Sequence, residues 1–556
     1  MPATTQAPPG PRRRSRLERA IDAATTRLFD LPRPRTDYTV TQRLRVPMRD
    51  GVHLLADHFA PTGPAVGTVL VRTPYGADLV SRALLVAPFA PRGYHVVLVQ
   101  CRGRFGSGGT FEPFMTEVDD AADTVRWLRV QPWFAGRFAT YGGSYLSFTQ
   151  WALLTDPPPE LAAAVVQVSL HDFSRAFHPE GAIALEAWLT FAELVAENPS
   201  VGAMYWRELT AVRRQRGALA HLPVAEAAER LVGDRAPWFR EYATHDDPDD
   251  PFWSRAQLGA ALERAEVPVL LQTGWQDLLL TQTLEQYRQL HRRGVDVALT
   301  VGPWTHSSFD VAGRSTIYRE TLEWLDEHLA GTRHSERPAP VRIHVTGAGA
   351  GSGQWRSLAS WPPPARDTVL HLLPHGRLGP RPAATGLPAA SFTYDPAEPT
   401  PSLGGRMLTG SKAGYRRDDA LARRSDVLAF TGPVLDAALE VVGVPTVELS
   451  HASDNPHADL FLRISDVDAR GRSRNVSDGF LRLQGASPTP RIVRVELDAV
   501  AHRFAAGHRI RLLVAGGSFP WRNRNLGTPD HATGTRVVPA RHTVEVTGSR
   551  LHLPAA

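Results

Sequence analysis

The 556-residue sequence contains one cysteine, Cys101. A single cysteine cannot form an internal disulfide bond, and it cannot build a structural zinc site made of several thiolates. The sequence also lacks any uninterrupted apolar run near the roughly 18 residues that a membrane-spanning helix needs. The N-terminus is polar and rich in proline, without the apolar segment of a secretory signal. These absences predict a cytoplasmic protein that has no membrane partner.

Positive charge is not concentrated in any long stretch of the sequence. The 62 Lys and Arg residues nearly balance the 57 Asp and Glu residues, and the formal net charge at pH 7 is +5. Basic residues cluster only within residues 11–16, without the interleaved aromatic and basic residues that are typical of nucleic-acid binding. We therefore expect no nucleic-acid partner. The sequence leaves open the role of the basic segment and the choice between a monomer and a homo-oligomer.

The N-terminal residues 1–37 are predicted to form a tail that precedes the folded domains. We expect disorder over about the first ten residues, because they are polar and rich in proline. Residues 11–30 are predicted to form an amphipathic helix. Its apolar positions are Leu17, Ile21, Ala24 and Leu28. We expect this helix to dock on the body of the protein, and an interaction tail is the alternative.

The rest of the chain divides into two domains by its hydrophobic pattern. In residues 38–335, buried apolar runs alternate with amphipathic helices, which is typical of a mostly parallel sheet with helices on both faces. Within this domain, residues 171–262 lose the alternation and are predicted to form a helical cap inserted over one end of the sheet. From 337 to 556, short alternating runs separated by Gly, Pro and Asp predict a β-sandwich.

The stretch around Ser144 has the pattern of a sharp strand-to-helix turn. An apolar strand over residues 138–141 breaks at Gly142 and Gly143, and a helix is predicted over residues 148–154. A serine on such a turn is exposed at the edge of the sheet, where its hydroxyl can act as a nucleophile. Because the pattern departs from the stricter G-x-S-x-G, a glycine turn with a helix-capping serine is the alternative interpretation.

Two further polar residues follow buried strands. Asp277 comes after the strand that ends at Leu271, and His306 comes after the strand that ends at Val301. Loops at the carboxyl ends of parallel strands meet at one edge of the sheet, so we expect both side chains to lie near Ser144. The three residues predict a catalytic triad in which His306 is the base and Asp277 orients its ring. This chemistry needs no metal or cofactor, and we expect neither.

A set of different short motifs is distributed along the chain. In the first half these are Met48-Arg-Asp-Gly51, Arg72-Thr-Pro-Tyr75, Arg102-Gly-Arg104, Gly142-Gly-Ser-Tyr-Leu146, Gly274-Trp-Gln-Asp277 and Gly302-Pro-Trp-Thr-His306. In the second half they are Asp426-Val-Leu-Ala-Phe430, Ser465-Asp-Val-Asp468, Ser477-Asp-Gly479 and Ala506-Gly-His-Arg-Ile-Arg-Leu512. As a set they resemble the cocaine esterase / X-Pro dipeptidyl peptidase family of serine hydrolases. The resemblance implies an α/β-hydrolase core with a helical cap, followed by a C-terminal jelly-roll sandwich.

The resemblance also implies an oxyanion hole. In it, the Tyr75 hydroxyl and the backbone N–H of Tyr145 donate to the oxyanion of a tetrahedral intermediate, and one such donor is commonly worth about 3 kcal/mol. A ring that packs in the core after Pro74 is the alternative interpretation of Tyr75. The sequence departs from the family pattern at Gln100, where Asp is common, and at Ser147, where glycine is usual; neither residue belongs to the predicted chemistry.

The acyl group of the substrate is predicted to be neutral. Amino-acid ester hydrolases of the resembled family carry carboxylates just after the catalytic Asp, whereas the segment after Asp277 is Leu278-Leu-Leu280. Burying an ammonium against leucines would be costly, so the sequence favours esters, or amides, of an apolar or aromatic acyl group. Trp188, Phe191 and Leu279 are the predicted pocket walls, although the two aromatic residues could equally belong to a helical core.

Three glutamates in the insertion, Glu180, Glu186 and Glu193, keep an alternative open. An ammonium bound there would indicate an X-Pro dipeptidyl aminopeptidase or an amino-acid ester hydrolase or acylase. Glu186 and Glu193 share one helix face, where we expect them to be solvated. An acyltransferase and a non-catalytic carbohydrate-binding relative are less favoured alternatives. The sequence favours a carboxylesterase-type hydrolase over a dipeptidyl peptidase, and it does not identify the natural substrate.

Overall fold

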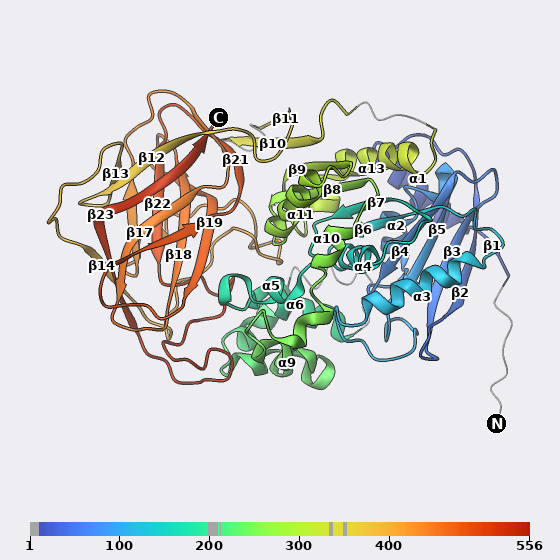
Figure 1. Ribbon diagram of the computed structural model, residues 1–556, viewed down its shortest axis with the longest axis horizontal. Coiled ribbons are helices and arrows are strands. Elements are labelled where there is room, and N and C mark those ends of the chain that lie inside the picture. The colour runs from blue at the N-terminus through green and yellow to red at the C-terminus, as the bar shows by residue number, and fades with distance from the viewer. Residues whose placement is uncertain (1–9, 198–209, 212, 333–336, 348–352) are drawn as a thin grey trace.

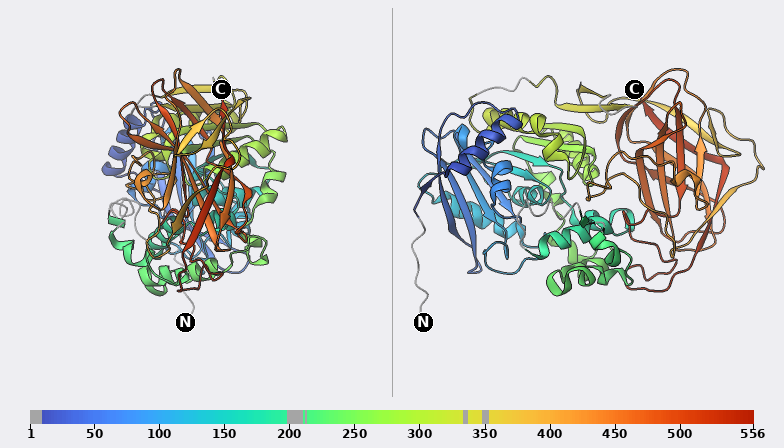
Figure 2. Two further views of the ribbon diagram at one scale, coloured as in Figure 1. Left: turned by 90° about the vertical axis from the view of Figure 1, so that its left-hand side faces the viewer. Right: turned by 180° about the vertical axis from the view of Figure 1, so that it is seen from behind.

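The protein consists of a mixed α/β part and an all-β part that lie side by side, as Figure 1 shows for the computed structural model. The structure describes residues 10–197, 210–211, 213–332, 337–347 and 353–556. The insertion, coloured green, packs under the α/β part and reaches the all-β part, and Figure 2 shows the same arrangement from behind. None of the helices in these ranges combines the length and apolar composition that a lipid bilayer requires.

The central sheet of the α/β part is parallel over its middle strands and antiparallel at both edges. Every residue of β5 and β8 is buried, as expected for a sheet covered by helices on both faces. In spatial order the strands are β2 (Tyr38–Pro47), β3 (His53–Pro61), β5 (Tyr94–Gln100), β4 (Gly67–Thr73), β6 (Phe138–Gly143), β7 (Leu161–Gln167), β8 (Val269–Gln276), β9 (Val297–Thr305), β10 (Val341–Gly347) and β11 (Gln354–Leu358). Short β1 (Arg12–Arg13) pairs with β2.

Helices connect these strands, as the alternating pattern predicts. The helices of the α/β part outside the insertion are α1 (Arg16–Leu28), α2 (Leu79–Leu85), α3 (Glu117–Arg129), α4 (Tyr145–Leu154), α11 (Leu280–Arg292), α12 (Phe309–Ala312) and α13 (Arg314–His328). The mixed α/β class with a β-rich C-terminal part is therefore confirmed.

The N-terminal helix α1 docks on the body, but through a neighbouring polar face and not through the predicted apolar one. Leu17 and Leu28 are 57% and 60% exposed, whereas Glu18, Asp22 and Thr25 are buried. Hydrogen bonds hold this polar face: Arg82 of α2 donates to Glu18 at 2.6 Å, and the hydroxyl of Tyr38 donates to Asp22 at 2.9 Å. The docked face was misassigned because a prediction from hydrophobicity places leucines in the interface. In the structure the interface instead holds carboxylates, which can be buried because they have hydrogen-bond partners there. The disorder predicted for the first residues concerns a stretch outside the described ranges, apart from Gly10.

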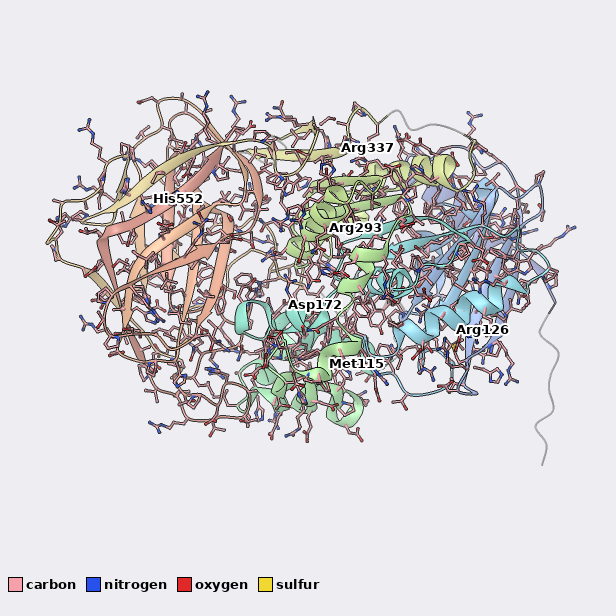
Figure 3. All side chains as sticks on the ribbon, in the orientation of Figure 1. Met115, Arg126, Asp172, Arg293, Arg337 and His552 are labelled. Carbon is pink, nitrogen blue, oxygen red and sulfur yellow. The ribbon has the colours of Figure 1, made fainter. Side chains whose placement is uncertain are left out.

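The insertion is helical, and its core is aromatic. The described helices are α5 (Phe173–Phe177), α6 (Leu185–Ala196), α8 (Ala227–Val232), α9 (Trp238–Thr244) and α10 (Gly259–Arg264). The chain enters this region at Asp172, labelled in Figure 3, whose carboxylate accepts a hydrogen bond from the backbone N–H of Arg175 and caps α5. Phe173 packs against Trp188, Tyr242 and Trp253, and all four rings are buried.

The all-β part is a sandwich with its own apolar core. Its long last strand pairs with β12, β14, β16 and β17 and so ties the sandwich together. The strands are β12 (Arg366–Leu373), β13 (Arg377–Gly379), β14 (Ala390–Tyr394), β15 (Val427–Thr431), β16 (Leu439–Gly443), β17 (Thr446–Ser453), β18 (Ala458–Val467), β19 (Ser473–Leu483), β20 (Arg491–Glu496), β21 (Val500–Phe504), β22 (Arg509–Ala515) and β23 (Ala540–Ala555).

The two parts are joined by a shared strand. β10 falls in the range predicted for the sandwich, yet it pairs in parallel with β9 of the central sheet. Its last two residues, Thr346 and Gly347, pair with β21 of the sandwich. Short alternating runs look alike in either sheet, so the pattern that placed the domain boundary at 337 could not show which sheet β10 joins.

A buried ion pair joins β4, α3 and α4 beneath the carboxyl edge of the central sheet. Arg72 and Glu117 are 4% and 2% exposed, and the Arg72 guanidinium donates to the Glu117 carboxylate at 2.6 Å. The second oxygen of this carboxylate accepts a hydrogen bond from the Tyr145 hydroxyl at 2.7 Å. Three elements that are distant in sequence are therefore held by one carboxylate.

Removal of one charge from this pair is expected to destabilise the fold more than removal of both. Glu117→Gln leaves the Arg72 cation buried without a counter-charge, and such a loss typically costs about 3–5 kcal/mol. Arg72→Met combined with Glu117→Gln removes both charges of the pair, so the double variant should be more stable than Glu117→Gln alone. Urea unfolding followed by tryptophan fluorescence measures the difference. A double variant less stable than Glu117→Gln would contradict this account.

Candidate active site

Ser144 lies on a strained turn between β6 and α4. Its backbone angles are φ 58° and ψ −125°, a region that residues with a Cβ rarely adopt. The Ser144 side chain makes no capping hydrogen bond, and α4 begins directly at Tyr145, three residues earlier than predicted. The structure therefore favours the exposed nucleophile turn over the helix-capping serine.

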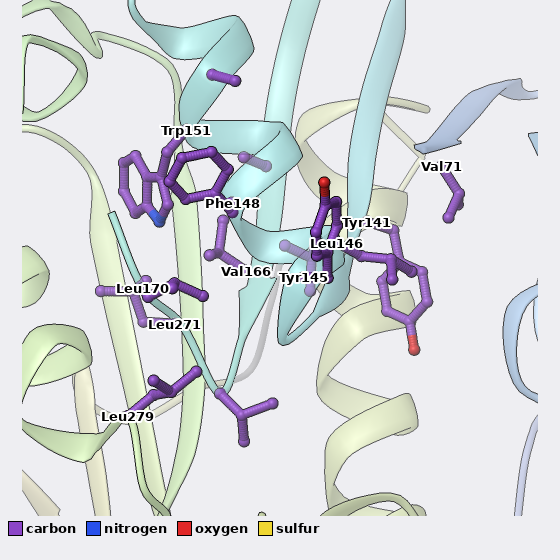
Figure 4. Close-up of a cluster of buried hydrophobic side chains, with 14 of the residues drawn as sticks. Val71, Tyr141, Tyr145, Leu146, Phe148, Trp151, Val166, Leu170, Leu271 and Leu279 are labelled. Carbon is purple, nitrogen blue, oxygen red and sulfur yellow. The ribbon is translucent and has the colours of Figure 1, made fainter. Parts of the chain in front are cut away.

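The neighbours of this turn leave no space for a side chain at Gly142. A Cβ on Gly142 would lie 2.5 Å from the Cβ of Leu146, and Gly142 has φ +145°, so only glycine fits. Figure 4 shows the buried side chains beneath the turn, where Phe148 and Trp151 of α4 gather with Val166 of β7. This packing fixes the start of α4 against the sheet.

The structure brings Ser144, His306 and Asp277 into one hydrogen-bonded series. The Nε2 atom of His306 lies 3.0 Å from the Ser144 Oγ, and its Nδ1 atom lies 2.7 Å from the Asp277 Oδ1. Asp277 is fully buried, and its other carboxylate oxygen accepts a hydrogen bond from Thr273 at 2.7 Å. An ionised Asp277 keeps the proton of the neutral ring on Nδ1, so Nε2 is free to accept the hydroxyl proton of Ser144.

Two hydrogen-bond donors flank Ser144. The Tyr75 hydroxyl interacts with the Ser144 side chain, and burial raises the pKa of this phenol, so it keeps its proton. The N–H of Tyr145 is the first of α4 and has no acceptor within the helix. The Tyr145 side chain points away from Ser144, since its hydroxyl binds Glu117. These donors can stabilise a negative oxygen that forms on a carbonyl bound next to Ser144.

Arg104 is a residue of the site that the sequence analysis did not identify. It comes from the glycine-rich loop 101–109, is 5% exposed, and donates to the backbone oxygens of Pro74 at 3.0 Å and Val195 at 2.5 Å. It therefore fixes the residue before Tyr75 against α6 of the insertion. An arginine among glycines directly after a buried parallel strand was the signal that could have indicated this role.

The three predicted pocket residues, Trp188, Phe191 and Leu279, line one cavity together with Ser144 and Tyr75. Trp188 and Phe191 are each 5% exposed and belong to the apolar core, so each of these residues both lines the cavity and packs in the core. The sequence did not single out other lining residues, among them Ser81, Leu84, Leu85, Phe114, Tyr141, Leu170, Ser307, Phe309, Asp310, Tyr318 and Leu408. Several of them come from distant elements, which no local pattern connects.

The three glutamates of the insertion each have partners. Glu186 and Glu193 are buried, which corrects the expectation that both are solvated. Glu186 accepts hydrogen bonds from the backbone N–H groups of Leu408 and Thr409 at 3.0 and 2.8 Å. Glu193 and Glu180 pair with arginines at 2.7 and 2.8 Å, the first with Arg214 and the second with Arg522. The spacing of the glutamates in the sequence could not predict these partners, because the partners lie outside α6.

In the described part of the chain, no group of three or more histidine, cysteine, aspartate or glutamate side chains is arranged to hold a metal ion.

Comparisons with known proteins cover most of the chain. Residues 50–308 match the X-Pro dipeptidyl-peptidase (S15 family) model, and residues 333–552 match the model of the X-Pro dipeptidyl-peptidase C-terminal non-catalytic domain. The cocaine esterase of Rhodococcus sp. (strain MB1 Bresler) is 30% identical over 544 residues, which cover 88% of this chain and 93% of that protein.

Solved structures share the fold at lower identity. An α-amino acid ester hydrolase superposes with a TM-score of 0.79 at 22% identity, over 94% of this chain and 97% of the other. An aminopeptidase from the marine sediment archaeon Thaumarchaeota archaeon gives 0.77 at 23% identity with the same coverage. The chain therefore belongs to the cocaine esterase / X-Pro dipeptidyl peptidase family of serine hydrolases.

Proposed function

We propose that the protein is a carboxylic ester hydrolase that acts on a neutral apolar or aromatic acyl group through an acyl-enzyme on Ser144. The observation that carries the proposal is the hydrogen-bonded series Ser144–His306–Asp277, which opens into a cavity walled by aromatic and aliphatic side chains. The family alone does not separate esterases from peptidases, so the acyl specificity rests on the cavity.

In the proposed mechanism, His306 takes the hydroxyl proton as the Ser144 Oγ attacks the ester carbonyl. Asp277 stabilises the imidazolium that forms, and Tyr75 and the N–H of Tyr145 donate to the oxyanion. His306 then gives the proton to the leaving alcohol, and the tetrahedral intermediate collapses to the acyl-enzyme. A water activated by His306 attacks the acyl carbonyl and releases the acid, which restores the Ser144 hydroxyl.

The walls of the cavity favour an apolar acyl group. Trp188, Phe191 and Leu279 offer no counter-charge for an ammonium, and Glu193, which also lines the cavity, is bound to Arg214 and Gln215. Binding an ammonium at Glu193 would require breaking these contacts. This arrangement disfavours the X-Pro dipeptidyl aminopeptidase and amino-acid ester hydrolase alternatives. Amide hydrolysis and acyl transfer share the same acyl-enzyme, so the acceptor molecule distinguishes them.

Ser144→Ala is expected to abolish ester hydrolysis while the fold is retained, because the hydroxyl that forms the acyl-enzyme is lost. The measurement compares p-nitrophenyl benzoate with Ala-Pro p-nitroanilide on the purified protein, with Ser144→Ala as the blank. We expect cleavage of the ester and not of the anilide. Hydrolysis by Ser144→Ala at the parent rate would exclude the nucleophile, and cleavage of the anilide would favour the peptidase alternative.

Tyr75→Phe is expected to lower kcat by about 100-fold with little change in KM, since one donor to the oxyanion is removed and the ring remains. Steady-state kinetics with p-nitrophenyl benzoate tests this expectation. Tyr141→Phe, which removes a phenol from another part of the same cavity, is the matched control and should lower kcat far less. An unchanged kcat in Tyr75→Phe would remove Tyr75 from the oxyanion hole.

A further inference from the structure

The N-terminal helix α1 carries an apolar stripe that lies at the surface of the described part of the chain. Leu17 and Leu28 are 57% and 60% exposed, Ala24 is exposed, and Ile21 is partly exposed. These four residues recur at helical spacing, which is the pattern by which a helix usually packs on its own protein. Because α1 docks through its polar face instead, the stripe remains open, and Figure 2 shows α1, in dark blue, on the outside of the α/β part.

The exposed side of α1 is also positively charged. Arg16, Arg19 and Arg27 are exposed, and none of them forms an ion pair with a carboxylate in the described ranges. The two carboxylates of the helix, Glu18 and Asp22, are buried and paired with other arginines. The surface of α1 therefore combines leucines with unpaired arginines and presents no acidic group of its own.

The carboxylates that flank α1 do not neutralise this charge. Asp30 pairs with Arg319, and Asp37 pairs with Arg14. Further exposed arginines lie just before and just after the helix, at positions 13, 33 and 35. The surplus of positive charge makes this side of the protein complementary to an anionic partner.

The exposed apolar surface extends from α1 to α12. The Nε atom of Arg314 donates to the backbone oxygen of Leu28 at 2.9 Å, and the same guanidinium donates to the backbone oxygen of Val311, which is 55% exposed. Phe29, the residue after Leu28, stacks on Tyr318 with ring centroids 4.8 Å apart, and Tyr318 lines the active-site cavity. The surface thus adjoins one wall of this cavity.

The charge decides which partner fits the stripe. In an isologous contact, a second copy of the chain would bring the arginines of α1 against the same arginines, with no free carboxylate on the helix to pair with them. An anionic lipid surface accommodates both features, since its phosphates attract arginines and its acyl boundary buries leucines. Leucines on one face of a helix and arginines on another are typical of helices that lie in the plane of a membrane surface.

We propose that α1 docks the protein on an anionic lipid surface. Leu17, Leu28 and Val311 enter the boundary between headgroups and acyl chains, and the arginines of the helix bind lipid phosphates. α1 remains folded on the body through its buried polar face. The sequence predicted no membrane partner because no run of residues could span a bilayer, but a helix that lies on the surface needs no such run.

Vesicle sedimentation tests the proposal with the full-length protein. We expect binding to vesicles made of equal parts of phosphatidylcholine and phosphatidylglycerol, and about tenfold weaker binding to phosphatidylcholine alone. Added salt should weaken the binding, because it screens the attraction between arginines and phosphates. An absence of binding to the anionic vesicles would overturn the proposal.

Two double variants separate the contribution of charge from that of apolar contact. Arg16→Gln with Arg27→Gln, and Leu17→Gln with Leu28→Gln, are each expected to weaken binding to the anionic vesicles by about tenfold. All four side chains are exposed, so we expect both variants to keep the fold. Binding that depends on the arginines and not on the leucines would indicate an acidic partner other than a membrane and would contradict the proposal.

The sandwich offers matched controls. Arg366→Gln with Arg381→Gln removes two exposed arginines, and Val434→Gln with Ile492→Gln removes two apolar side chains that are 44% and 57% exposed. Both controls should bind the anionic vesicles as the parent protein does. A loss in the controls equal to that in the α1 variants would mean that binding is not localised to α1, and the proposal would fail.

A fluorescent label tests the contact directly. Cys101, the one cysteine of the chain, is buried, and burial raises the pKa of its thiol, so a thiol-reactive dye attaches to a cysteine introduced at the surface. An environment-sensitive dye on Leu28→Cys should shift its emission to shorter wavelength with anionic vesicles, whereas the dye on Ile492→Cys should not. Equal shifts at both positions, or no shift at Leu28→Cys, would refute the docking of α1.

Light scattering tests the competing partner, a second copy of the chain. If a second copy covered the stripe, the parent protein would be a dimer, and Leu17→Gln with Leu28→Gln would be a monomer. That result, together with no binding to anionic vesicles, would replace the lipid surface by a self-association surface and overturn the proposal. A mass that is equal in the parent and in the leucine variant supports the lipid surface.

Discussion

The carboxylate of Glu117 is the interaction on which the geometry around Ser144 depends. It receives Arg72 from the end of β4 and the Tyr145 hydroxyl from the first turn of α4. The two proposed donors to the oxyanion follow from these anchors: Tyr75 comes three residues after Arg72, and the second donor is the N–H of Tyr145 itself. One buried charge thus sets the spacing of two donors that come from different elements. Preorganised donors of this kind stabilise a transition state without rearranging during the reaction.

Three regions of the chain together form the walls of the cavity. The central sheet supplies Ser144 and His306, the insertion supplies Trp188 and Phe191, and the loop between β14 and β15 supplies Leu408. Glu186 holds Leu408 in place through hydrogen bonds to the backbone. A residue that was a candidate for binding the substrate therefore shapes the cavity by binding the second part of the protein.

Sequence patterns predicted the site where each residue follows from a local rule. Ser144, Asp277 and His306 each come after a buried parallel strand, and the carboxyl ends of such strands must meet at one edge of the sheet. The patterns failed where the partner is distant. No local pattern indicated a role for Arg104 in the site, Glu186 and Glu193 were expected in solvent, and the docked face of α1 was misassigned. In each case a buried polar group is stabilised by a residue far along the chain, and hydrophobic periodicity carries no information about such pairs. The family resemblance supplied Tyr75, which local patterns could not distinguish from a core residue.

The shared strand β10 has a consequence for how the two halves can be separated. It continues the central sheet beyond β9 and also contacts β21, so it belongs to both halves at once. Cutting the chain before Val341 would leave β9 as an open edge with unpaired backbone groups, and open edges recruit strands from other molecules. The catalytic half expressed alone would therefore be prone to self-association, and exchange of C-terminal halves between relatives would succeed more readily if the crossover point lay after β11 than before β10.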